Sequence, residues 1–410
     1  MPERFTNPWP ARVPGFREVL RWKLGCGEKE VPEFPHARDP APWVALTTEQ
    51  LHRMPERGWL VSWLGHASFL LSGCGMHLLI DPMFSEYCGP LRLLGLRRKA
   101  PLPCRPDDLP PITAVLLTHT HYDHCDLPTL RALGKDTPLI VPEGHAAWFA
   151  SLGFVRVTPV AWWRSFDIAQ GVSVTATPAQ HFTARTPWDR NRGHWCGWCI
   201  AGGGVSLWHS GDSGYCPAFG EIGARLGPLD FGMISIGAYQ PRWFMRPLHM
   251  TPGEAVKAFQ ETGCRHATAM HWGTFELSDE PLGEPPLLLV RELLDRGVPT
   301  DRFTTGCVGQ QWSVVEASGV SVSNAHDTPE QPTTIEGLDP RSPPLFDGGG
   351  KTLHQSDVSH LQLRWLHFRG QHGKGITMDE GGTSAPPSQH MSFAHVQVED
   401  CSRCACVEMR

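Results

Sequence analysis

The sequence of 410 residues has no long apolar run, and this absence limits the classes of protein it can belong to. Its apolar stretches, such as AVLL and PPLLLV, are far shorter than the roughly 20 residues that a membrane-spanning helix needs. The first segment, MPERFTNPWPARVPGF, has no apolar stretch behind a basic one. We therefore expect no transmembrane helix, no signal peptide, and a cytoplasmic protein that can still associate peripherally with a membrane.

The sequence also lacks an excess of basic residues. It has 36 Lys and Arg against 42 Asp and Glu, which gives a formal net charge of −6. Because binding to a phosphate backbone needs a basic face, this balance argues against nucleic acid as a partner. The composition, 40% hydrophobic and 19% charged, is typical of a soluble globular protein, and 13 cysteines without an export signal indicate mostly free thiols.

The chain divides into three segments by composition. Residues 1–57 are rich in Pro, Arg and Trp, so we interpret them as an arm packed on the main domain, with a short helix near Phe16–Leu24. Residues 58–315 carry strand-like and helix-like patterns and form the predicted main domain. Residues 316–410 are rich in Pro, Gly, Ser and Thr with few apolar anchors, which predicts a low-complexity, disordered tail.

The main domain contains strands in series with helices between them. Runs such as WLVSWLGHASFLLS, MHLLIDP and ITAVLLT are strand-like, and CGWCIAGGGVSLWHSGD indicates two strands about a glycine-rich turn. The clearest helix lies between Thr251 and Gly263, where Thr251 is an N-cap, Pro252 takes the first position and Glu254 completes a capping box. This order predicts an α/β fold of layered sheets and helices.

A histidine-rich motif follows one of these strands. The segment LLTHTHYDHCD places His119, His121, Asp123 and His124 directly after a buried apolar run. Imidazole is the commonest metal ligand in proteins, and residues two apart in an extended segment point the same way. His119 and His121 can therefore share one metal, while Asp123 and His124 can face a second one as the chain turns toward a helix.

Three later strand ends supply further candidate ligands. TATPAQH ends at His181, SLWHSGD ends at Asp212, and RHATAMHWG carries His271. A lone histidine at a strand end is usually only hydrogen-bonded, so none of these is informative by itself. Together with the first cluster they give five histidines and two aspartates, a set that suits two zinc ions bridged by a carboxylate and a water molecule.

This ligand order resembles the metallo-β-lactamase superfamily, whose fold is a four-layer αββα sandwich. Further motifs, in the same order, are similar to the family of phospholipases D that hydrolyse N-acylphosphatidylethanolamine: NPWP, WLGHAS, DPMFS, PAQHFTARTPWDRN, SGDSGYCPAF, PRWFM and MHWGTFELSDEP. The similarity extends from about Arg4 to Val315, and the tail has no counterpart. The resemblance implies two Zn²⁺ per chain, one held by His119, His121 and His181, the other by Asp123, His124 and His271, with Asp212 as the bridge.

The resemblance also implies supporting and catalytic residues. Asp81, in LLIDP, matches a strand-end carboxylate that orients a metal-bound imidazole, although a turn aspartate is an equally good reading. His66, in WLGHAS, is interpreted as a partner of a ligand rather than a core histidine. Catalytic parts are assigned to Asp123 and to His249, a candidate acid for the leaving group, with a helix-entry role for His249 as the alternative. The vertebrate enzymes have Gln before this histidine, whereas this chain has Leu248, which puts identical substrate handling in doubt.

The implied activity is that of a zinc-dependent phosphodiesterase of phospholipase D type. It would hydrolyse N-acylphosphatidylethanolamine, a phospholipid, to N-acylethanolamine and phosphatidic acid by a metal-bridging hydroxide. A homodimer is compatible with this activity. The alternative is a lactonase or phosphodiesterase of the same superfamily that acts on a soluble sugar phosphate or a related small substrate. The motifs PAQH…TPWDRN and PRWFM favour the phospholipase.

A lipid substrate needs an apolar groove and a surface that faces the membrane. The segment GPLRLLGLRRKAPLP sets leucines beside basic residues, a pattern that favours anionic interfaces. An ordinary surface loop with its leucines turned into the domain is the alternative. The candidates for a membrane contact or a substrate groove are Leu94, Leu96, Arg97, Arg98, Trp243 and Phe244.

Overall fold

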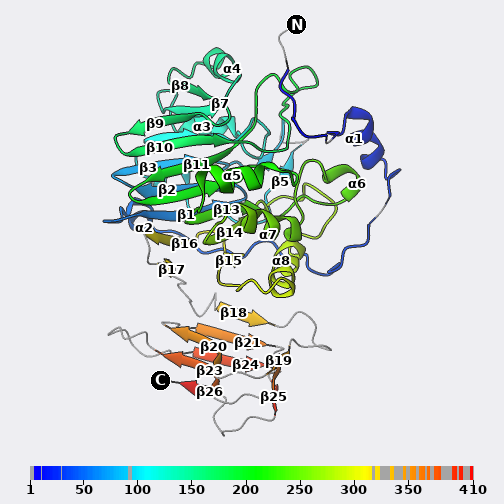
Figure 1. The fold of residues 1–410 in the computed structure, drawn as a ribbon, viewed down its shortest axis with the longest axis vertical. Helices are drawn as coiled ribbons and strands as arrows, with labels where there is room; N and C mark the ends of the chain where they lie inside the picture. The colour runs from blue at the N-terminus through cyan, green and yellow to red at the C-terminus, as the bar shows by residue number, and fades with distance from the viewer. Residues whose placement is uncertain are drawn as a thin grey trace. The chain divides into compact units, whose positions relative to one another are not determined.

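The chain forms two compact units in the computed structural model, Met1–Ser323 and Asn324–Arg410 (Figure 1). The first unit contains the arm and the whole of the predicted main domain. The structure describes residues 4–10, 12–28, 30–90, 95–315 and 319–323, and nine short strands after residue 332.

One sheet of the first unit has the strand order β17-β16-β1-β2-β3-β6-β7-β8. Strands β16, β1, β2 and β3 pair antiparallel, whereas β3, β6, β7 and β8 pair parallel. The strands are Trp59–Gly65 (β1), Ser68–Gly73 (β2), Met76–Ile80 (β3), Ala114–Leu116 (β6), Leu139–Pro142 (β7), Val157–Val160 (β8), Gln311–Val315 (β16) and Gly319–Ser323 (β17).

The other sheet of this unit has the order β15-β14-β13-β12-β11-β10-β9. Here β9 to β12 pair antiparallel and β12 to β15 pair parallel. The strands are Ser165–Ala169 (β9), Val172–Thr177 (β10), Gly197–Gly202 (β11), Val205–His209 (β12), Phe231–Ser235 (β13), His266–Met270 (β14) and Phe303–Thr304 (β15), and a separate pair is formed by Tyr87–Cys88 (β4) and Leu96–Arg97 (β5).

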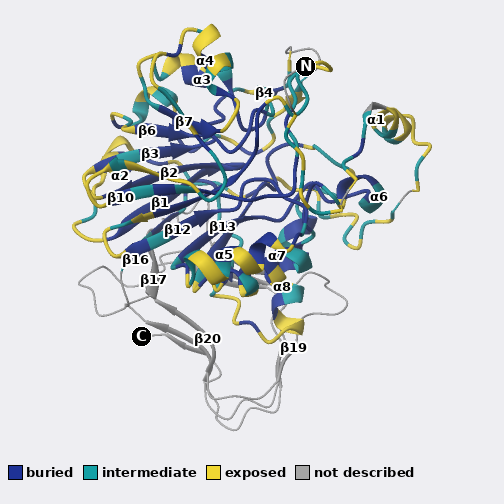
Figure 2. Cartoon of the chain, turned by 45° about the horizontal axis from the view of Figure 1, so that its top comes forward, coloured by how far each residue is buried: buried dark blue, intermediate teal, exposed yellow. Residues whose placement is uncertain are grey.

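Strand β1 shows that the first sheet is covered on both faces. Successive side chains of a strand point to opposite faces, and every residue of β1 is buried. Val61 and Trp63 belong to a core shared with Trp198 of the second sheet, whereas Leu64 belongs to another core shared with Phe149 of a helix. Figure 2 shows the strands of both sheets mainly as buried. The predicted four-layer αββα sandwich is confirmed.

The helices complete the outer layers. Helix α4 contacts β8 of the first sheet, and α7 contacts β13 of the second while packing against α5 and α8. The predicted capping box is present, since Thr251 accepts a hydrogen bond from Glu254 N at the start of α7. Among the described residues, no helix is both long and apolar enough to cross a membrane. The helices are Phe16–Lys23 (α1), Thr48–His52 (α2), Leu127–Ala132 (α3), Ala146–Ser151 (α4), Ala218–Leu226 (α5), Arg242–Met245 (α6), Pro252–Glu261 (α7) and Glu284–Asp295 (α8), with a 3₁₀ turn at Pro106–Asp108.

The ends of the parallel strands position the predicted ligands. Because parallel neighbours run in one direction, their carboxyl ends lie at the same edge of a sheet. In the first sheet, β3 and β6 lead into Asp81 and His119. In the second sheet, β12 and β14 both pair with β13 and lead into Asp212 and His271.

The arm packs along the first unit. Phe5 N donates a hydrogen bond to Asn191 O at 3.0 Å. Further along, Trp22 of α1 donates its indole N–H to the carboxylate of Asp279 at 2.9–3.0 Å. These contacts fasten both ends of the arm's first half to segments far away in the sequence.

The C-terminal part begins later than the sequence predicts. Strand β17 pairs antiparallel with β16, so the first unit extends beyond Val315. In the second unit, parallel strands form three sheets of three strands each. The residues between these strands lie outside the described residues, so the disorder of 316–410 stays a prediction. The strands are Thr333–Glu336 (β18), Leu345–Asp347 (β19), Lys351–Ser356 (β20), His360–Arg364 (β21), His367–Arg369 (β22), Lys374–Asp379 (β23), His390–Ala394 (β24), Gln397–Glu399 (β25) and Val407–Met409 (β26).

A chain that ends at Ser323 should fold with the Tm of the full chain, because the first unit is then complete. A chain that ends at Gln310 loses β16 and with it the buried side chains of Trp312 and Val314. That loss should cost at least about 3 kcal/mol of unfolding free energy, measured as a lower midpoint in urea. If the chain ending at Ser323 unfolds as early as the shorter one, the boundary is wrong.

Candidate metal centre

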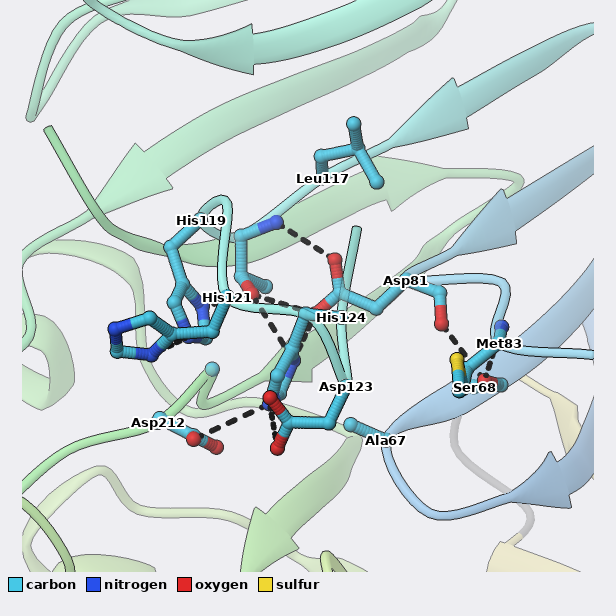
Figure 3. A network of polar contacts seen from close by, with 12 residues as sticks. Ala67, Ser68, Asp81, Met83, Leu117, His119, His121, Asp123, His124 and Asp212 are labelled. Carbon is cyan, nitrogen blue, oxygen red and sulfur yellow. Dashed lines mark hydrogen bonds and ion pairs between the residues drawn. The ribbon is translucent and has the colours of Figure 1, made fainter. Parts of the chain in front are cut away.

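Asp81 holds the loop after β6 at Thr118, the residue directly before the first candidate ligand, His119 (Figure 3). Its carboxylate is fully buried and accepts hydrogen bonds from Thr118 N at 2.8 Å and from Thr118 Oγ1 at 2.5 Å. It also lies 2.7 Å from His124 Nδ1. When a carboxylate takes the Nδ1–H of an imidazole, Nε2 is left free to bind a metal. Asp81 therefore directs His124 Nε2 into the site.

Three imidazole nitrogens meet on one side of the centre. His119 Nε2 lies 2.9 Å from His121 Nδ1, which in turn lies 3.2 Å from His181 Nε2. Nitrogens bound to one zinc at about 2.0–2.1 Å in a tetrahedron are about 3.3 Å apart, close to these spacings. His181 donates its Nδ1–H to Leu248 O at 3.0 Å, and His119 Nδ1 lies 2.9 Å from Thr118 Oγ1. These outer contacts turn the inner nitrogens toward one point.

Two carboxylates lie on the other side. Asp212 Oδ2 is 3.2 Å from His124 Nε2 and 3.1 Å from His271 Nε2. The same oxygen is 3.9 Å from His181 Nε2 in the first group. Asp123 Oδ2 is 3.4 Å from His271 Nε2 and 3.6 Å from His124 Nε2. Asp212 thus faces both groups of histidines, which is the position predicted for a bridging carboxylate.

Burial and charge divide the histidines into two kinds. Burial lowers the pKa of His121 to about 3 and that of His181 to about 4, so both imidazoles are neutral, the form that binds metals. Burial also disfavours the charged form of His271, but Asp212 and Asp123 outweigh it and raise the pKa to about 9. A proton on His271 thus compensates the two carboxylates, and a cation between them would supply the same charge.

Several buried polar atoms in this cluster have no hydrogen-bond partner. They include Asp212 Oδ1, His124 Nε2, His271 Nε2 and His249 Nδ1, although each of these imidazoles is within ion-pair distance of the other oxygen of Asp212. An unpaired buried polar atom costs about 1–3 kcal/mol, so the cluster fits bound cations better than empty space. Imidazole nitrogens and carboxylate oxygens are ligands that suit zinc, and the residues fit two such ions.

His66 contacts two of the candidate ligands, Asp123 and His271. Its Nε2 lies 3.1 Å from Asp123 Oδ2, and its ring lies 4.1 Å from the ring of His271. The ring of Phe275 meets it edge to face at 5.3 Å, and Thr274 Oγ1 accepts a hydrogen bond from His66 N. The structure therefore places His66 beside a ligand, as the sequence predicts, rather than in the apolar core.

His249 lies at the open side of the centre. Its Nδ1 is 3.9 Å from Asp212 Oδ2, and its ring is 5.1 Å from that of His181. Burial lowers its pKa well below the usual value, so the imidazole is neutral at pH 7. His249 precedes α7, but its side chain lines the groove at the metal centre instead of only leading into the helix.

An apolar groove of about 840 Å³ opens onto the centre. Val13 and Val19 of the arm form one wall, Phe182 after the β10 strand end forms another, and Phe244 with Leu248 forms the third. Phe244 was predicted to line such a groove, and the structure places it there. Apolar walls around a polar end suit a ligand that has an acyl chain and a charged group.

Trp243, the neighbour of Phe244, does not line this groove. It lines a separate cavity, and its indole N–H donates a hydrogen bond to Glu28 O at 3.2 Å. In a helix, consecutive residues point about 100° apart, so the two aromatic rings of α6 reach different surfaces. Leu94 was also predicted here and lies outside the described residues.

The basic part of the predicted membrane segment is also placed differently. Leu96 and Arg97 form the exposed strand β5, and neither lines the groove. Arg98 turns inward, donates to the carbonyl oxygens of Met83 and Ser85, and lies over the ring of Phe275. The prediction that Arg98 faces a membrane is therefore wrong, because backbone carbonyls and an aromatic ring take up its guanidinium.

The part that the arm plays in the site is not evident from the sequence. Asn7 donates its side-chain N–H to His181 O at 2.9 Å, so the arm holds the backbone of a candidate ligand. Val13, Pro14 and Val19 then form a wall of the groove. The one signal in the sequence was the amphipathic pattern FREVLRWK, which predicts a helix but not what the helix covers.

Replacing Asp81 with asparagine should weaken metal binding about 10–100-fold, the usual effect of losing the carboxylate partner of a metal-bound imidazole. The measurement is competition with a chromophoric chelator at pH 7. Asp230→Asn is the matched control. Asp230 accepts a hydrogen bond from Ser206 N at 2.8 Å and directly precedes β13, at the end of that strand away from the candidate ligands. Equal affinity in the Asp81→Asn variant and the unmodified chain would contradict the role of Asp81.

Residues 77–272 match the β-lactamase superfamily domain. Among solved structures, a possible metal-dependent hydrolase of Veillonella parvula superposes with a TM-score of 0.52 at 18% identity. That similarity covers 63% of this chain and 100% of the other, and it shows the fold alone.

Relatives with known names share more of the sequence. The chain is 30% identical over 327 residues to N-acyl-phosphatidylethanolamine-hydrolyzing phospholipase D 1 of Caenorhabditis elegans, which covers 76% of this chain and 91% of the relative. It is 33% identical over 232 residues to the mitochondrial N-acyl-phosphatidylethanolamine-hydrolyzing phospholipase D of Saccharomyces cerevisiae, covering 55% and 49%. The chain therefore belongs to the N-acylphosphatidylethanolamine-hydrolysing phospholipase D family within the β-lactamase superfamily.

Proposed function

We propose that the chain is a zinc-dependent phosphodiesterase of phospholipase D type, which hydrolyses N-acylphosphatidylethanolamine to N-acylethanolamine and phosphatidic acid. The observation that carries this proposal is an apolar groove that ends on a buried cluster of histidines and aspartates arranged for two cations. The names of the worm and yeast relatives support the same substrate. At the level of reaction class, the chain is a metal-dependent hydrolase of the metallo-β-lactamase superfamily.

Two zinc ions bound here would lower the pKa of a water molecule toward about 7 and neutralise charge that builds on a phosphoryl group. The chain's own part is to hold the ligands in fixed directions. Asp81 takes the outer nitrogen of His124, and the Leu248 carbonyl takes that of His181. Asp212 and Asp123, both buried, keep negative charge at the centre, where the groove reaches it.

His249 is placed to contact the phosphoryl group. Because burial keeps its imidazole neutral at pH 7, its N–H donates a hydrogen bond to a phosphoryl oxygen rather than a full proton to the leaving group. This changes the role that the sequence suggested, from acid to positioning donor. A neutral donor is also compatible with a nearby pair of cations, which would repel an imidazolium.

The mouth of the groove offers a surface for a lipid bilayer. Leu20 and Leu24, on and just after α1, are 48% and 66% exposed, and Trp188 is 73% exposed. Val19, which precedes Leu20, and Pro187, which precedes Trp188, line the groove. Exposed leucines beside the basic residues of α1, together with an exposed tryptophan, suit an anionic interface. We assign the membrane contact to this rim rather than to Leu96, Arg97 and Arg98.

Replacing Asp212 with asparagine should lower turnover about 100-fold or more and reduce bound zinc from about two ions per chain to about one, because the shared carboxylate is lost. Mass spectrometry of the products and elemental analysis measure the two effects. Asp167→Asn, on the exposed strand β9, should change neither. Wild-type turnover in Asp212→Asn, or no zinc in the gently purified chain, would refute the proposal.

The double change Leu20→Ser and Leu24→Ser should raise KM for vesicles about tenfold, since two leucine side chains no longer enter the bilayer. The kcat on a short-chain, monomeric substrate should stay the same, because neither residue reaches the centre. Leu294→Ser, at 65% exposure on α8, is the matched control.

Turnover of soluble sugar phosphodiesters but not of N-acyl lipids in micelles would favour the alternative function instead.

A further inference from the structure

A second cavity, of about 580 Å³, lies between the arm and α6. Trp9 and Arg12 of the arm face Arg242 and Trp243 of α6, with Arg246 at the end of the helix. Among the described residues, none lines both this cavity and the groove at the metal centre. The proposed phospholipase activity makes no use of it.

The cavity carries excess positive charge, although the chain as a whole has a formal net charge of −6. Its lining includes three arginines but only one acidic residue, Glu254. Arg242 is bound to both oxygens of Glu254, at 3.1 and 2.9 Å, so this pair is neutral. Arg12 pairs with Glu18 at 3.1 Å, but its side chain is 89% exposed. Such exposed pairs are worth about 1 kcal/mol at most, so Arg12 can exchange Glu18 for a ligand.

Arg246 has no carboxylate within ion-pair distance in the part of the chain that the structure describes. It lies close enough to Arg242 to affect it: burial lowers the pKa of Arg242, Glu254 opposes that shift, and Arg246 adds to it. Like charges held close together favour an anion between them. Arg246 is therefore the open cationic position of the cavity.

The aromatic walls of the cavity are held in place by contacts outside it. The ring of Trp9 stacks on that of Trp162, with 6.0 Å between the ring centroids, and Trp243 lies under the guanidinium of Arg21 at 5.1 Å. The hydroxyl of Tyr215 donates to Glu261 at 2.7 Å, so this group is not free to bind a ligand. Ligand recognition thus falls to the guanidinium groups, whose planar N–H donors match phosphate oxygens.

We propose that this cavity is a second anion site that takes a phosphate monoester, separate from the metal centre. Arg246 and Arg12 would bind the phosphoryl oxygens, and Arg242 would be kept in position by Glu254. A compact dianion matches two guanidinium groups that lack a strongly bound carboxylate. Inorganic phosphate and the headgroup of phosphatidic acid both present this chemistry.

The floor of the cavity connects it with the metal centre. Gln180 and Pro247 both line it, and Gln180 donates its side-chain N–H to Pro247 O at 3.2 Å. Gln180 directly precedes His181, and Pro247 comes two residues before His249. An anion in the cavity therefore contacts the two segments that carry a candidate ligand and the positioning histidine.

Isothermal titration of the zinc-loaded chain with inorganic phosphate tests the proposal. Because a zinc centre also binds phosphate, the unmodified chain should bind about two phosphates and the double variant Arg12→Gln/Arg246→Gln about one. Arg225→Gln removes one positive charge from α5, as Arg246→Gln does at the cavity, and should still bind two phosphates; its guanidinium lies over Trp163 at 4.3 Å. Should the double variant not fold, judged by its Tm, Arg246→Gln alone should weaken the second phosphate about tenfold.

Flotation with phosphatidylcholine vesicles, with or without phosphatidic acid, separates the two sources of the ligand. A deficit of the double variant in the phosphate titration supports a site for free phosphate. A deficit only with vesicles that contain phosphatidic acid supports a site for the lipid headgroup. If the double variant and Arg246→Gln match the unmodified chain and Arg225→Gln in both experiments, the proposal is wrong.

Discussion

The burial of two carboxylates inside a β-sandwich is the constraint on which the rest of the site depends. Asp123 is 8% exposed and Asp212 is 3% exposed, and an isolated buried carboxylate costs several kcal/mol. Positive charge must therefore be present beside them, as a proton on an imidazole or as a metal ion. The surrounding contacts, from Asp81 on His124 to the Leu248 carbonyl on His181, keep nitrogen atoms turned toward those oxygens.

The ligand set could be predicted from the sequence because each ligand has a local mark. His119 to His124 form one dense motif after a strand, and His181, Asp212 and His271 each follow a strand of their own. Parallel pairing of β12, β13 and β14 brings the strand ends before Asp212 and His271 to a shared edge. Strand β10, before His181, runs in the same direction as β12 because two antiparallel pairings separate them, so it ends at the same edge. This arrangement is a property of the fold rather than of any single residue. The start of α7 could be predicted for the same reason, since the capping box of Thr251 and Glu254 lies within four consecutive residues.

The walls of the groove could not be predicted in the same way. They come from the arm, from the segment after His181 and from α6, and no local pattern states which of these surfaces meet. Trp243 and Phe244 are adjacent in the sequence, yet they line different cavities. Arg98 looked like a residue for an anionic surface, but its partners are carbonyls that only the folded chain brings near. Contacts between distant segments decide these positions, whereas hydrophobic pattern and charge do not.

The docking of the arm also sets an order of events during protein synthesis. Phe5 pairs with Asn191, and Trp43 forms a bridge with Val308, so the arm depends on segments that are made much later. A ribosome releases the chain from its N-terminus, which means that the arm has no complete surface to bind while most of the sandwich is still being translated. Such long-range pairing makes folding slow. The nascent chain must therefore carry the arm unpaired, exposed to chaperones and proteases, until those later segments have emerged.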